Sequence, residues 1–441
     1  MRAYPLLCLA LIATVLIASC TPKETVTTPP VTDQPVVATQ PDADTTEAAP
    51  PSEPAADASE LAGSDWPRFF GPNADGTSPD TGINKDWSAK PPQELWRVSL
   101  GDDGYAGPAV ADGKVFIVDH QGKDDVVRAI DIATGKDAWT FPYPEPGGHN
   151  YGFTRGTPCY DNGTLYTLSM SGQLHAINAA DGTKVWSKNL PQDFGGKAPN
   201  WRYASSPVVD GDRLVVLPGG QSSVAVLDKT TGDTIWAGGG PSGASYATPT
   251  IATINGVKQY IVFTAEALTG VKADDGTVLW DVQWPTKHRV NAAMPVADGD
   301  HVFATSNYQY GGGLYEISGS SAKQVWFSKE MQSHFSSPVY YEGFLYGTTD
   351  PGDLICMTPA DGKVMWRQSG FEKGGTLIVD GVVIAMNGKG GDVVMAEAST
   401  AGYKELGRIK PLDGQSWTAP IVAMGRLLVR NKGAMVCLDL R

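Results

Sequence analysis

An all-β fold, built as a ring of eight four-stranded blades, is predicted by three features of the sequence. A phrase of eleven residues ending in tryptophan recurs along most of the chain, and a proline-led alternating pattern accompanies it. The last repeat stops before its tryptophan, while an unmatched tryptophan stands ahead of the first repeat. The composition agrees, because 51 glycines, 32 prolines and only 19% charged residues suit short strands and turns better than long exposed helices.

The recurrent phrase is clearest as AIDIATGKDAW, which ends at Trp139 and has Gly135 four residues before the tryptophan. Two copies are irregular, since Ala322 replaces the glycine in one and Leu406 replaces the tryptophan in another. The tryptophans recur at about 40–50 residues, which is typical of propeller blades rather than of helical repeats. The copies that keep the tryptophan end at Trp139, Trp186, Trp236, Trp280, Trp326 and Trp366.

Each phrase follows a segment that alternates around a turn, such as SPVVDGDRLVVL, in which an Asp-Gly pair is a strong hairpin signal. One unit therefore contains two strands of a hairpin, a third strand, a turn and a fourth strand with the tryptophan, which makes one antiparallel blade. Counting the hairpins predicts eight blades, with starts near Gly107, Thr157, Ser205, Ala247, Ala293, Ser336, Gly374 and Trp417.

The eighth blade runs out of chain at GAMVCLDLR, after its third strand. The missing strand is expected to be QELWRVSL, from Gln93 to Leu100, because Trp96 there has no blade before it. This pairing closes the ring and removes the open interface of a non-cyclic array. Trp96 thus joins the six other tryptophans as residues expected to dock between blades.

The N-terminal region predicts a membrane anchor and a tether. Residues 1–19 have one basic residue and then a short apolar run, as in a signal peptide, and LIASC resembles a bacterial lipobox with Cys20 as the acylated residue. Residues 20–64 are rich in Pro, Thr, Ala and acids, and such a segment is expected to be disordered. Residues 65–93 form a lead-in expected to pack on the ring, and residues 94–441 form the propeller.

Several classes of site are not indicated. The net charge of −14 argues against a nucleic-acid surface, and no nucleophile elbow, P-loop or dinucleotide fingerprint occurs. The six histidines lack a known metal-ligand spacing, so no metal site is predicted. Cys159, Cys356 and Cys437 are too scattered to indicate a disulfide framework. No catalytic residue is predicted.

The phrase at Ala129–Trp139 resembles the tryptophan-docking motif of PQQ-like propeller repeats, and the resemblance covers about 94–441. It implies that each indole stacks against a small residue of the neighbouring blade, a position held here by Ala129, Ala176, Val226, Gly270, Cys356 and Cys437. The lead-in DWPRFFGPNADGTSP resembles the opening of secreted proteins with these repeats. Its Trp66, Phe69 and Phe70 are expected to cover apolar surface on the ring.

Two branches of this superfamily differ in what they imply. Quinoprotein dehydrogenases hold PQQ and calcium in a central funnel and use a vicinal cysteine pair, which this sequence lacks. Outer-membrane assembly lipoproteins of the BamB type combine a lipobox, a tether and a compact ring without a cofactor. The lipobox, blade count and length resemble the second branch, although the long acidic tether and the lead-in differ from it.

Segments that enter the innermost strands are expected to line one mouth of the funnel. Aromatic and cationic residues gather there and could hold an anionic, sugar or peptide ligand. The competing interpretation is a hydrated rim common to any eight-bladed ring. The candidates are Tyr105, Arg155, Arg202, Tyr203, Tyr246, Asn291, His334 and Trp417.

These observations predict a non-enzymatic binding or scaffold lipoprotein of the bacterial cell envelope. It is expected to be a monomeric propeller, lipid-anchored in the outer membrane and facing the periplasm, with an envelope protein or polymer as partner. No cofactor is expected. The alternatives are an oxidoreductase that uses PQQ and calcium, and a propeller that binds a small molecule or carbohydrate in its funnel.

Overall fold

A computed structural model describes residues 63–101 and 103–441. The predicted signal peptide, Cys20 and residues 20–62 of the predicted tether lie outside the described residues. Within the described part, no helix is both long enough and apolar enough to cross a membrane. The described residues contain one α-helix, α1 (Leu190–Phe194), and one 3₁₀ helix, η2 (Lys287–Arg289).

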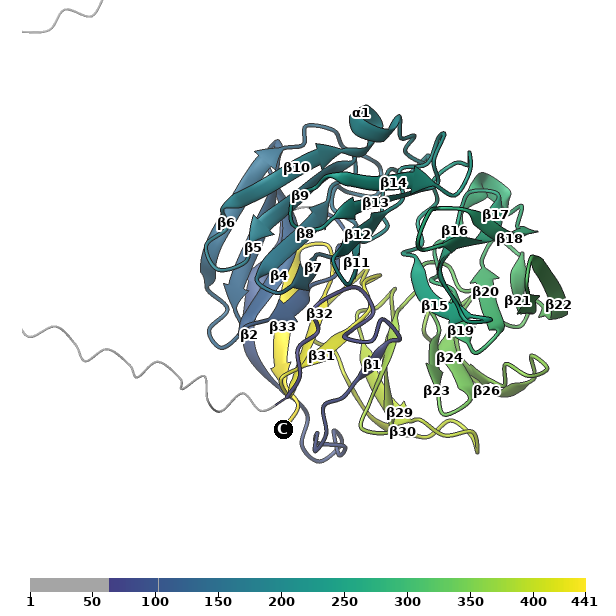
Figure 1. Ribbon diagram of the computed structural model, residues 1–441. Coiled ribbons are helices and arrows are strands. Elements are labelled where there is room, and N and C mark those ends of the chain that lie inside the picture. Colours follow the sequence, from purple (N-terminus) through teal and green to yellow (C-terminus); the bar gives the residue numbers. More distant parts are fainter. Residues whose placement is uncertain (1–62, 102) are drawn as a thin grey trace, which may run out of the picture. The chain divides into compact units, whose positions relative to one another are not determined.

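Eight antiparallel blades form a ring (Figure 1). Blades one to four run in chain order: β3 (Ala109–Ala111), β4 (Lys114–Gln121), β5 (Asp124–Asp131), β6 (Asp137–Pro144); β7 (Cys159–Asp161), β8 (Thr164–Leu168), β9 (Gln173–Asn178), β10 (Lys184–Asn189); β11 (Val208–Asp210), β12 (Arg213–Val216), β13 (Val224–Asp228), β14 (Thr234–Gly238); β15 (Thr250–Ile254), β16 (Val257–Phe263), β17 (Ala267–Lys272), β18 (Val278–Gln283).

Blades five to seven continue in the same order, and blade eight takes its fourth strand from the start of the ring. They contain β19 (Val296–Asp298), β20 (His301–Ser306), β21 (Gly311–Ser318), β22 (Ser321–Ser328); β23 (Val339–Tyr341), β24 (Phe344–Thr349), β25 (Asp353–Met357), β26 (Val364–Ser369); β27 (Thr376–Val379), β28 (Val382–Met386), β29 (Val393–Glu397), β30 (Glu405–Ile409); β31 (Ile421–Ala423), β32 (Arg426–Arg430), β33 (Ala434–Asp439) and β2 (Gln93–Ser99). The predicted fold class and blade count are confirmed.

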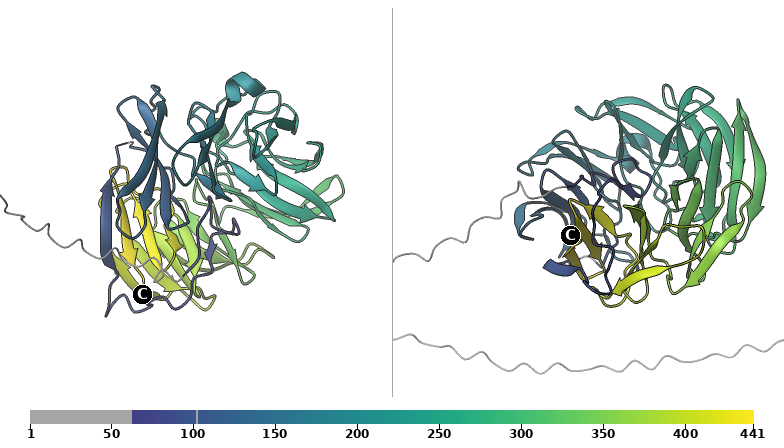
Figure 2. Two further views of the ribbon diagram at one scale, coloured as in Figure 1. Left: turned by 60° about the vertical axis from the view of Figure 1, so that its left-hand side comes forward. Right: turned by 90° about the horizontal axis from the view of Figure 1, so that it is seen from below.

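The ring is closed by the strand that the sequence predicted. β2 pairs antiparallel with β33, and Trp96 stands opposite Cys437. The purple N-terminal strand therefore lies beside the yellow C-terminal strands in Figure 1 and in the turned views of Figure 2. The two ends of the ring are thus held in one sheet.

Six of the repeat tryptophans donate their indole N–H to a backbone carbonyl of the next blade. Trp96 donates to Ile132 at 2.8 Å, and this bond joins blade eight to blade one. The corresponding bonds elsewhere are Trp139–Ala179, Trp186–Lys229, Trp236–Ala273, Trp326–Pro359 and Trp366–Ser399, at 2.6–3.1 Å. Each bond satisfies a buried or half-buried donor at the blade interface.

The small residue of the repeat lies in a different place from the one implied by the family resemblance. Ala129 is the cross-strand partner of Trp139 within the same blade, and Cys437 has the same relation to Trp96. The neighbouring blade instead contributes the turn glycine. A Cβ atom on Gly135 would lie 2.7 Å from Cγ of Trp96. The small residue therefore makes room for the tryptophan of its own blade. The turn glycine makes room for the tryptophan of the preceding blade.

Trp280 departs from the predicted docking pattern. Its indole N–H donates at 2.8 Å to the side-chain oxygen of Gln259 in its own blade. The next blade has Ala322 where the turn glycine should stand, so the usual docking surface is missing. Trp284 fills the interface as well; it is fully buried and donates to Ser306 of blade five. Both indoles belong to the apolar cluster shared by blades four and five.

Blade seven lacks a repeat tryptophan, and the lead-in supplies one. Trp87 is buried in the apolar cluster shared by blades seven, eight and one, against which Leu406 also packs. A Cβ atom on Gly407 would lie 2.4 Å from Cβ of Trp87, so glycine is needed for this contact. Trp87 therefore occupies the interface at which Leu406 replaces the tryptophan.

The lead-in is fixed to the inner strands of the ring. Trp66 exchanges two backbone hydrogen bonds with Val110 of β3, at 2.8 and 2.9 Å. Strand β1 (Thr77–Ser78) pairs parallel with β27. The buried carboxylate of Asp80 accepts hydrogen bonds from Ser64 and from the N–H of Gly425. The lead-in is therefore part of the folded ring.

Bulges protect the outer edges of the blades. The register between the third and fourth strands shifts just before the repeat tryptophan. In five blades the extra residue of this bulge is apolar and exposed: Leu95, Val185, Ile235, Val325 and Met365. A bulge breaks the regular edge along which another strand could pair.

Replacing Gly135 with alanine is expected to destabilise the protein by about 1–3 kcal/mol more than replacing Gly113. Both glycines have a positive φ, +71° and +68°, so both variants carry the same backbone strain of about 1–2 kcal/mol. Only the Gly135 variant adds a clash with Trp96, because nothing lies within 4 Å of a Cβ on Gly113. Denaturant unfolding followed by circular dichroism measures the difference. Equal losses would show that the docking contact contributes nothing.

Candidate functional site

A cavity of about 250 Å³ occupies the centre of the ring. Its walls are residues that precede or begin the innermost strands, including Pro108, Thr157, Thr248, Ser336 and Thr376. Trp66, Phe69 and Phe70 of the lead-in line one end. The long loops that connect successive blades line the other end, so the cavity lies between the lead-in and the loops.

The structure brings together five of the eight predicted funnel residues. Tyr105, Arg155, Tyr246, His334 and Trp417 line the cavity. The remaining three do not. Arg202 is exposed, Tyr203 is buried with its hydroxyl donating to the carbonyl of Pro218, and Asn291 is fully buried in a network with Thr286, Ser306 and the carbonyl of Thr264.

Besides Phe335, which follows the candidate His334, three aromatic residues of the connecting loops that line the cavity are not among the sequence candidates. Tyr151 and Trp201 lie further out in their connecting loops, and Tyr308 lies between β20 and β21 rather than before an innermost strand. The signal that could have found Tyr151 and Trp201 is the aromatic content of the two long loops, FPYPEPGGHNYGF and GGKAPNWRY. Tyr308 gives no comparable signal.

Aromatic rings form a continuous layer on one side of the cavity. The ring of Trp417 stacks on Tyr105, with centroids 5.2 Å apart, and contacts Phe335 at the same distance and Tyr151 at 6.3 Å. The ammonium of Lys373 lies 5.1 Å from the Trp417 ring, a cation–π distance. The layer presents flat apolar faces beside a positive charge.

Buried polar groups fix the loop that carries Tyr105. Arg430 is 1% exposed and donates to the carbonyls of Gly104 and Ala106, at 2.9 and 3.1 Å. The N–H of Tyr105 donates to the carbonyl of Thr154, which lies in the loop that carries Tyr151 and Arg155. Burial raises the pKa of Tyr105 to about 12, so this hydroxyl stays protonated.

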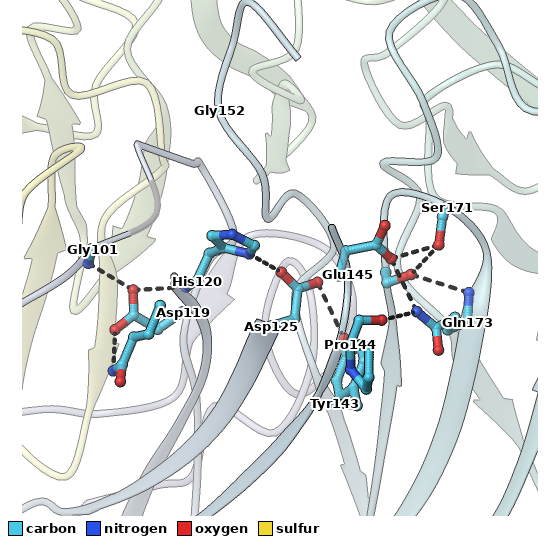
Figure 3. Close-up of polar contacts among 12 residues, drawn as sticks. Gly101, Asp119, His120, Asp125, Tyr143, Pro144, Glu145, Gly152, Ser171 and Gln173 are labelled. Carbon is cyan, nitrogen blue, oxygen red and sulfur yellow. Dashed lines mark hydrogen bonds and ion pairs between the residues drawn. The ribbon is translucent and has the colours of Figure 1, made fainter. Parts of the chain in front are cut away.

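A second set of polar residues supports the loop that carries Tyr151 and Arg155 (Figure 3). His120 Nδ1 lies 2.8 Å from Asp125, and Tyr143 donates to the other carboxylate oxygen at 3.3 Å. Phe153 stacks on the His120 ring at 3.6 Å. Burial and the nearby Glu145 raise the pKa of Asp125 to about 7, against the hydrogen bond from His120.

The neighbouring carboxylate has its own donors. Glu145 is buried and accepts from Ser171 at 2.5 Å and from Gln173 at 3.2 Å (Figure 3). His120 and Asp125 are 3% and 0% exposed, so neither can reach a substrate. We assign this cluster to positioning the loop of Tyr151 and Arg155.

The donor set of the cavity does not fit calcium. Hard cations are bound by carboxylate, carbonyl and amide oxygens, and none of the described residues that line the cavity is Asp, Glu, Asn or Gln. The described residues also hold no group of three His, Cys, Asp or Glu side chains that could bind a metal. The lining hydroxyls of Ser and Thr are weak substitutes.

The cysteines are buried thiols within the blades. Burial raises the pKa of Cys159 and Cys356 to about 11 and that of Cys437 to about 12, so the reactive thiolate is disfavoured. Cys356 and Cys437 stand opposite Trp366 and Trp96 as small packing residues.

Replacing His175 with leucine is expected to reduce the loss of stability in acid. His175 is 6% exposed beside Tyr143, and burial lowers its pKa from 6.5 to about 4. The unfolded chain binds a proton below pH 6.5, whereas the folded chain binds it only near pH 4. Stability is therefore lost as the pH falls from 6.5 to 4, by about 2–3 kcal/mol. Urea unfolding of the variant and of the wild type at pH 7 and 4.5 measures this. An unchanged dependence in the His175 variant would contradict the assignment.

Comparison with known proteins matches two overlapping segments, 86–151 and 123–368, to the family described as outer membrane protein assembly factor BamB. One similar relative is the BamB protein of Xanthomonas campestris, which is 32% identical over 108 residues that cover 23% of this chain and 26% of the relative. Another is the BamB protein of Moranella endobia, which is 21% identical over 311 residues that cover 63% of this chain and 72% of the relative. The match thus spans only about a quarter of the Xanthomonas protein.

The quinoprotein branch is also represented. A quinone alcohol dehydrogenase subunit of Gluconacetobacter polyoxogenes is 29% identical over 141 residues, which cover 29% of this chain and 19% of the relative.

Solved structures share the fold at 14% identity. BamB from Moraxella catarrhalis has a TM-score of 0.60 and covers 79% of this chain and 99% of its own. A europium-containing methanol dehydrogenase has a TM-score of 0.64, with 86% and 99% covered. These likenesses show the propeller alone. The second family match spans 123–368 by itself, which is more than half of the 441 residues. The chain therefore belongs to the BamB outer membrane protein assembly factor family of PQQ-like propellers.

Proposed function

We propose that the protein is a non-enzymatic scaffold lipoprotein of the bacterial cell envelope, which binds other envelope proteins as a BamB-type assembly factor. The observation that carries this proposal is the family match over the repeats of the ring. The quinoprotein relatives cover less of this chain than the Moranella BamB protein does. The described residues that line the cavity include no carboxylate, which also favours a role without calcium.

The proposed location is the periplasmic face of the outer membrane. It is supported by the LIASC sequence, in which Cys20 would carry the lipid, and by the BamB relatives. The acidic residues 21–62 would then act as a spacer between the membrane and the ring.

A cysteine exchange tests the anchor. Cys20→Ala is expected to abolish incorporation of labelled palmitate and to move the protein from the outer-membrane fraction to the soluble fraction. The matched control is Cys8→Ala within the predicted signal peptide, which should keep both properties. Unchanged membrane attachment of the Cys20 variant would contradict lipid anchoring at this residue.

Capture with the anchor intact tests the scaffold role. Crosslinking in cells, followed by purification of the full chain, is expected to recover an outer-membrane β-barrel protein. The Cys20→Ala variant, which should leave the membrane, serves as the control and should recover less. Exclusive recovery of a soluble polymer would contradict the assembly role and indicate carbohydrate or peptide capture.

A PQQ-dependent oxidoreductase is the second candidate, favoured by the relative that is a quinone alcohol dehydrogenase. The purified protein would be incubated with PQQ and Ca²⁺ and assayed for dye-linked oxidation of alcohols. We expect no turnover, because none of the described residues that line the cavity is a carboxylate that could hold the ion. Sustained turnover would overturn the scaffold proposal.

A further inference from the structure

The central cavity has a charge opposite to that of the whole protein. The chain contains 48 acidic and 34 basic residues, yet Arg155 and Lys373 line the cavity and no described residue in its lining is acidic. A positive, low-dielectric pocket in an acidic protein attracts anions and repels cations. The lining of the cavity therefore favours an anionic ligand.

Arg155 is a half-buried cation without a carboxylate partner among the described residues. Its Nη2 donates to the carbonyl of Gly152 at 3.3 Å, while its buried Nε has no partner in the described part of the chain. Burying an unpaired guanidinium is costly, and a carboxylate that accepts two parallel hydrogen bonds is the usual compensation. Burial also lowers the pKa of Arg155 below its ordinary value.

The rest of the lining favours a flat apolar body over a sugar. Tyr105, Trp417 and Phe335 form a layer of rings, and Lys373 lies over the Trp417 ring. The hydroxyls of sugars are commonly held by amide and carboxylate side chains, which the described lining lacks. Aromatic ligands instead gain offset stacking on such a layer.

The dimensions favour a ligand of one or two rings. The cavity of about 250 Å³ is smaller than the pockets that hold drug-sized molecules. Trp66, Phe69 and Phe70 line the end formed by the lead-in, so a long flexible chain would have little room to extend there. A fatty acid is therefore disfavoured even though it is also an apolar anion.

We propose that the central cavity binds a small aromatic monoanion, with its carboxylate on Arg155 and its ring against the Tyr105–Trp417 layer. This binding site is additional to the proposed scaffold function and does not depend on it.

Calorimetric titration of the full-length protein tests the site with indole-3-acetate as the probe. Binding is expected to be about tenfold or more tighter than that of indole-3-acetamide, which lacks the charge, of acetate, which lacks the ring, and of octanoate, which has a flexible chain. Comparable binding of the amide or of octanoate would overturn the choice of ligand. Preferential binding of PQQ, or no measurable binding of indole-3-acetate, would overturn the proposal.

Variants locate the binding. Arg155→Gln is expected to weaken binding of indole-3-acetate about tenfold or more, and Trp417→Leu to weaken it as well, whereas Arg155→Lys should retain part of it. The matched control is Arg202→Gln, because Arg202 is exposed and does not line the cavity. Thermal melting confirms that each variant is folded. Equal affinities in folded Arg155→Gln and Arg202→Gln proteins would contradict the role of Arg155.

Discussion

Replacing Trp96 with alanine is expected to lower the free energy of unfolding by about 3–5 kcal/mol. The indole is 8% exposed, donates to Ile132 of blade one at 2.8 Å and packs on Gly135. Its removal leaves a cavity between blades eight and one, and the Ile132 carbonyl keeps only its hydrogen bond from Arg426. The effect is large because β2 is the strand that joins the two ends of the ring.

Guanidinium unfolding followed by far-ultraviolet circular dichroism measures this loss. Limited trypsin digestion gives a second measurement, since fraying of β2 should speed cleavage at Arg97, which is held by Glu94 in the native protein. The matched control is Leu95→Ala on the same strand, whose side chain is 42% exposed and should contribute little. A loss in the Trp96 variant no larger than that in the Leu95 variant would show that the ring does not depend on this closure.

The architecture was predictable because its determinants recur. Every blade repeats the hairpin and most repeat the tryptophan phrase, so an irregular copy can be recognised from the regular ones. The partner of β33 was found from a simple imbalance, since Trp96 had no blade before it and the last blade had no tryptophan. Trp96 stands opposite Cys437 in the closed sheet.

The irregular interfaces could not be predicted because each is repaired by residues outside the repeat. Ala322 removes the docking surface for Trp280. Trp284, four residues beyond the end of the phrase, fills the gap and donates to Ser306. Leu406 leaves an interface that Trp87 fills from the lead-in, more than 300 residues earlier. A repeat pattern indicates where packing is missing, but not which distant side chain completes it.

The candidate site was predicted only in part, because loop conformation decides which side chains reach the cavity. Arg202 and Tyr203 are adjacent to the lining residues Trp201 and Ala204, yet one is exposed and the other buried. Arg202 has a φ of +68° and lies in a turn in which its N–H donates to the carbonyl of Pro199. Sequence spacing identifies the loop, whereas the backbone conformation of the loop decides which of its residues face the cavity.

Replacing Trp66 with alanine is expected to cost about 3–5 kcal/mol and to open the cavity at the end formed by the lead-in. Trp66 is 2% exposed, pairs through its backbone with Val110 and lines the cavity with its ring. A Cβ atom on Gly71 would lie 3.0 Å from the same ring, so the lead-in folds tightly around the indole. Its loss removes apolar contacts to both the lead-in and blade one.

Chemical unfolding and amide hydrogen exchange distinguish the two parts of this effect. The free energy of unfolding reports the lost packing, and faster exchange of the Val110 amide, which donates to the carbonyl of Trp66 at 2.8 Å, reports release of the lead-in from β3. Phe69→Ala is the matched control, because Phe69 also lines the cavity but is only half-buried. It should cost clearly less and leave exchange at Val110 slow. If both variants lost the same stability with Val110 still protected, Trp66 would be a surface cover rather than the residue that ties the lead-in to the ring.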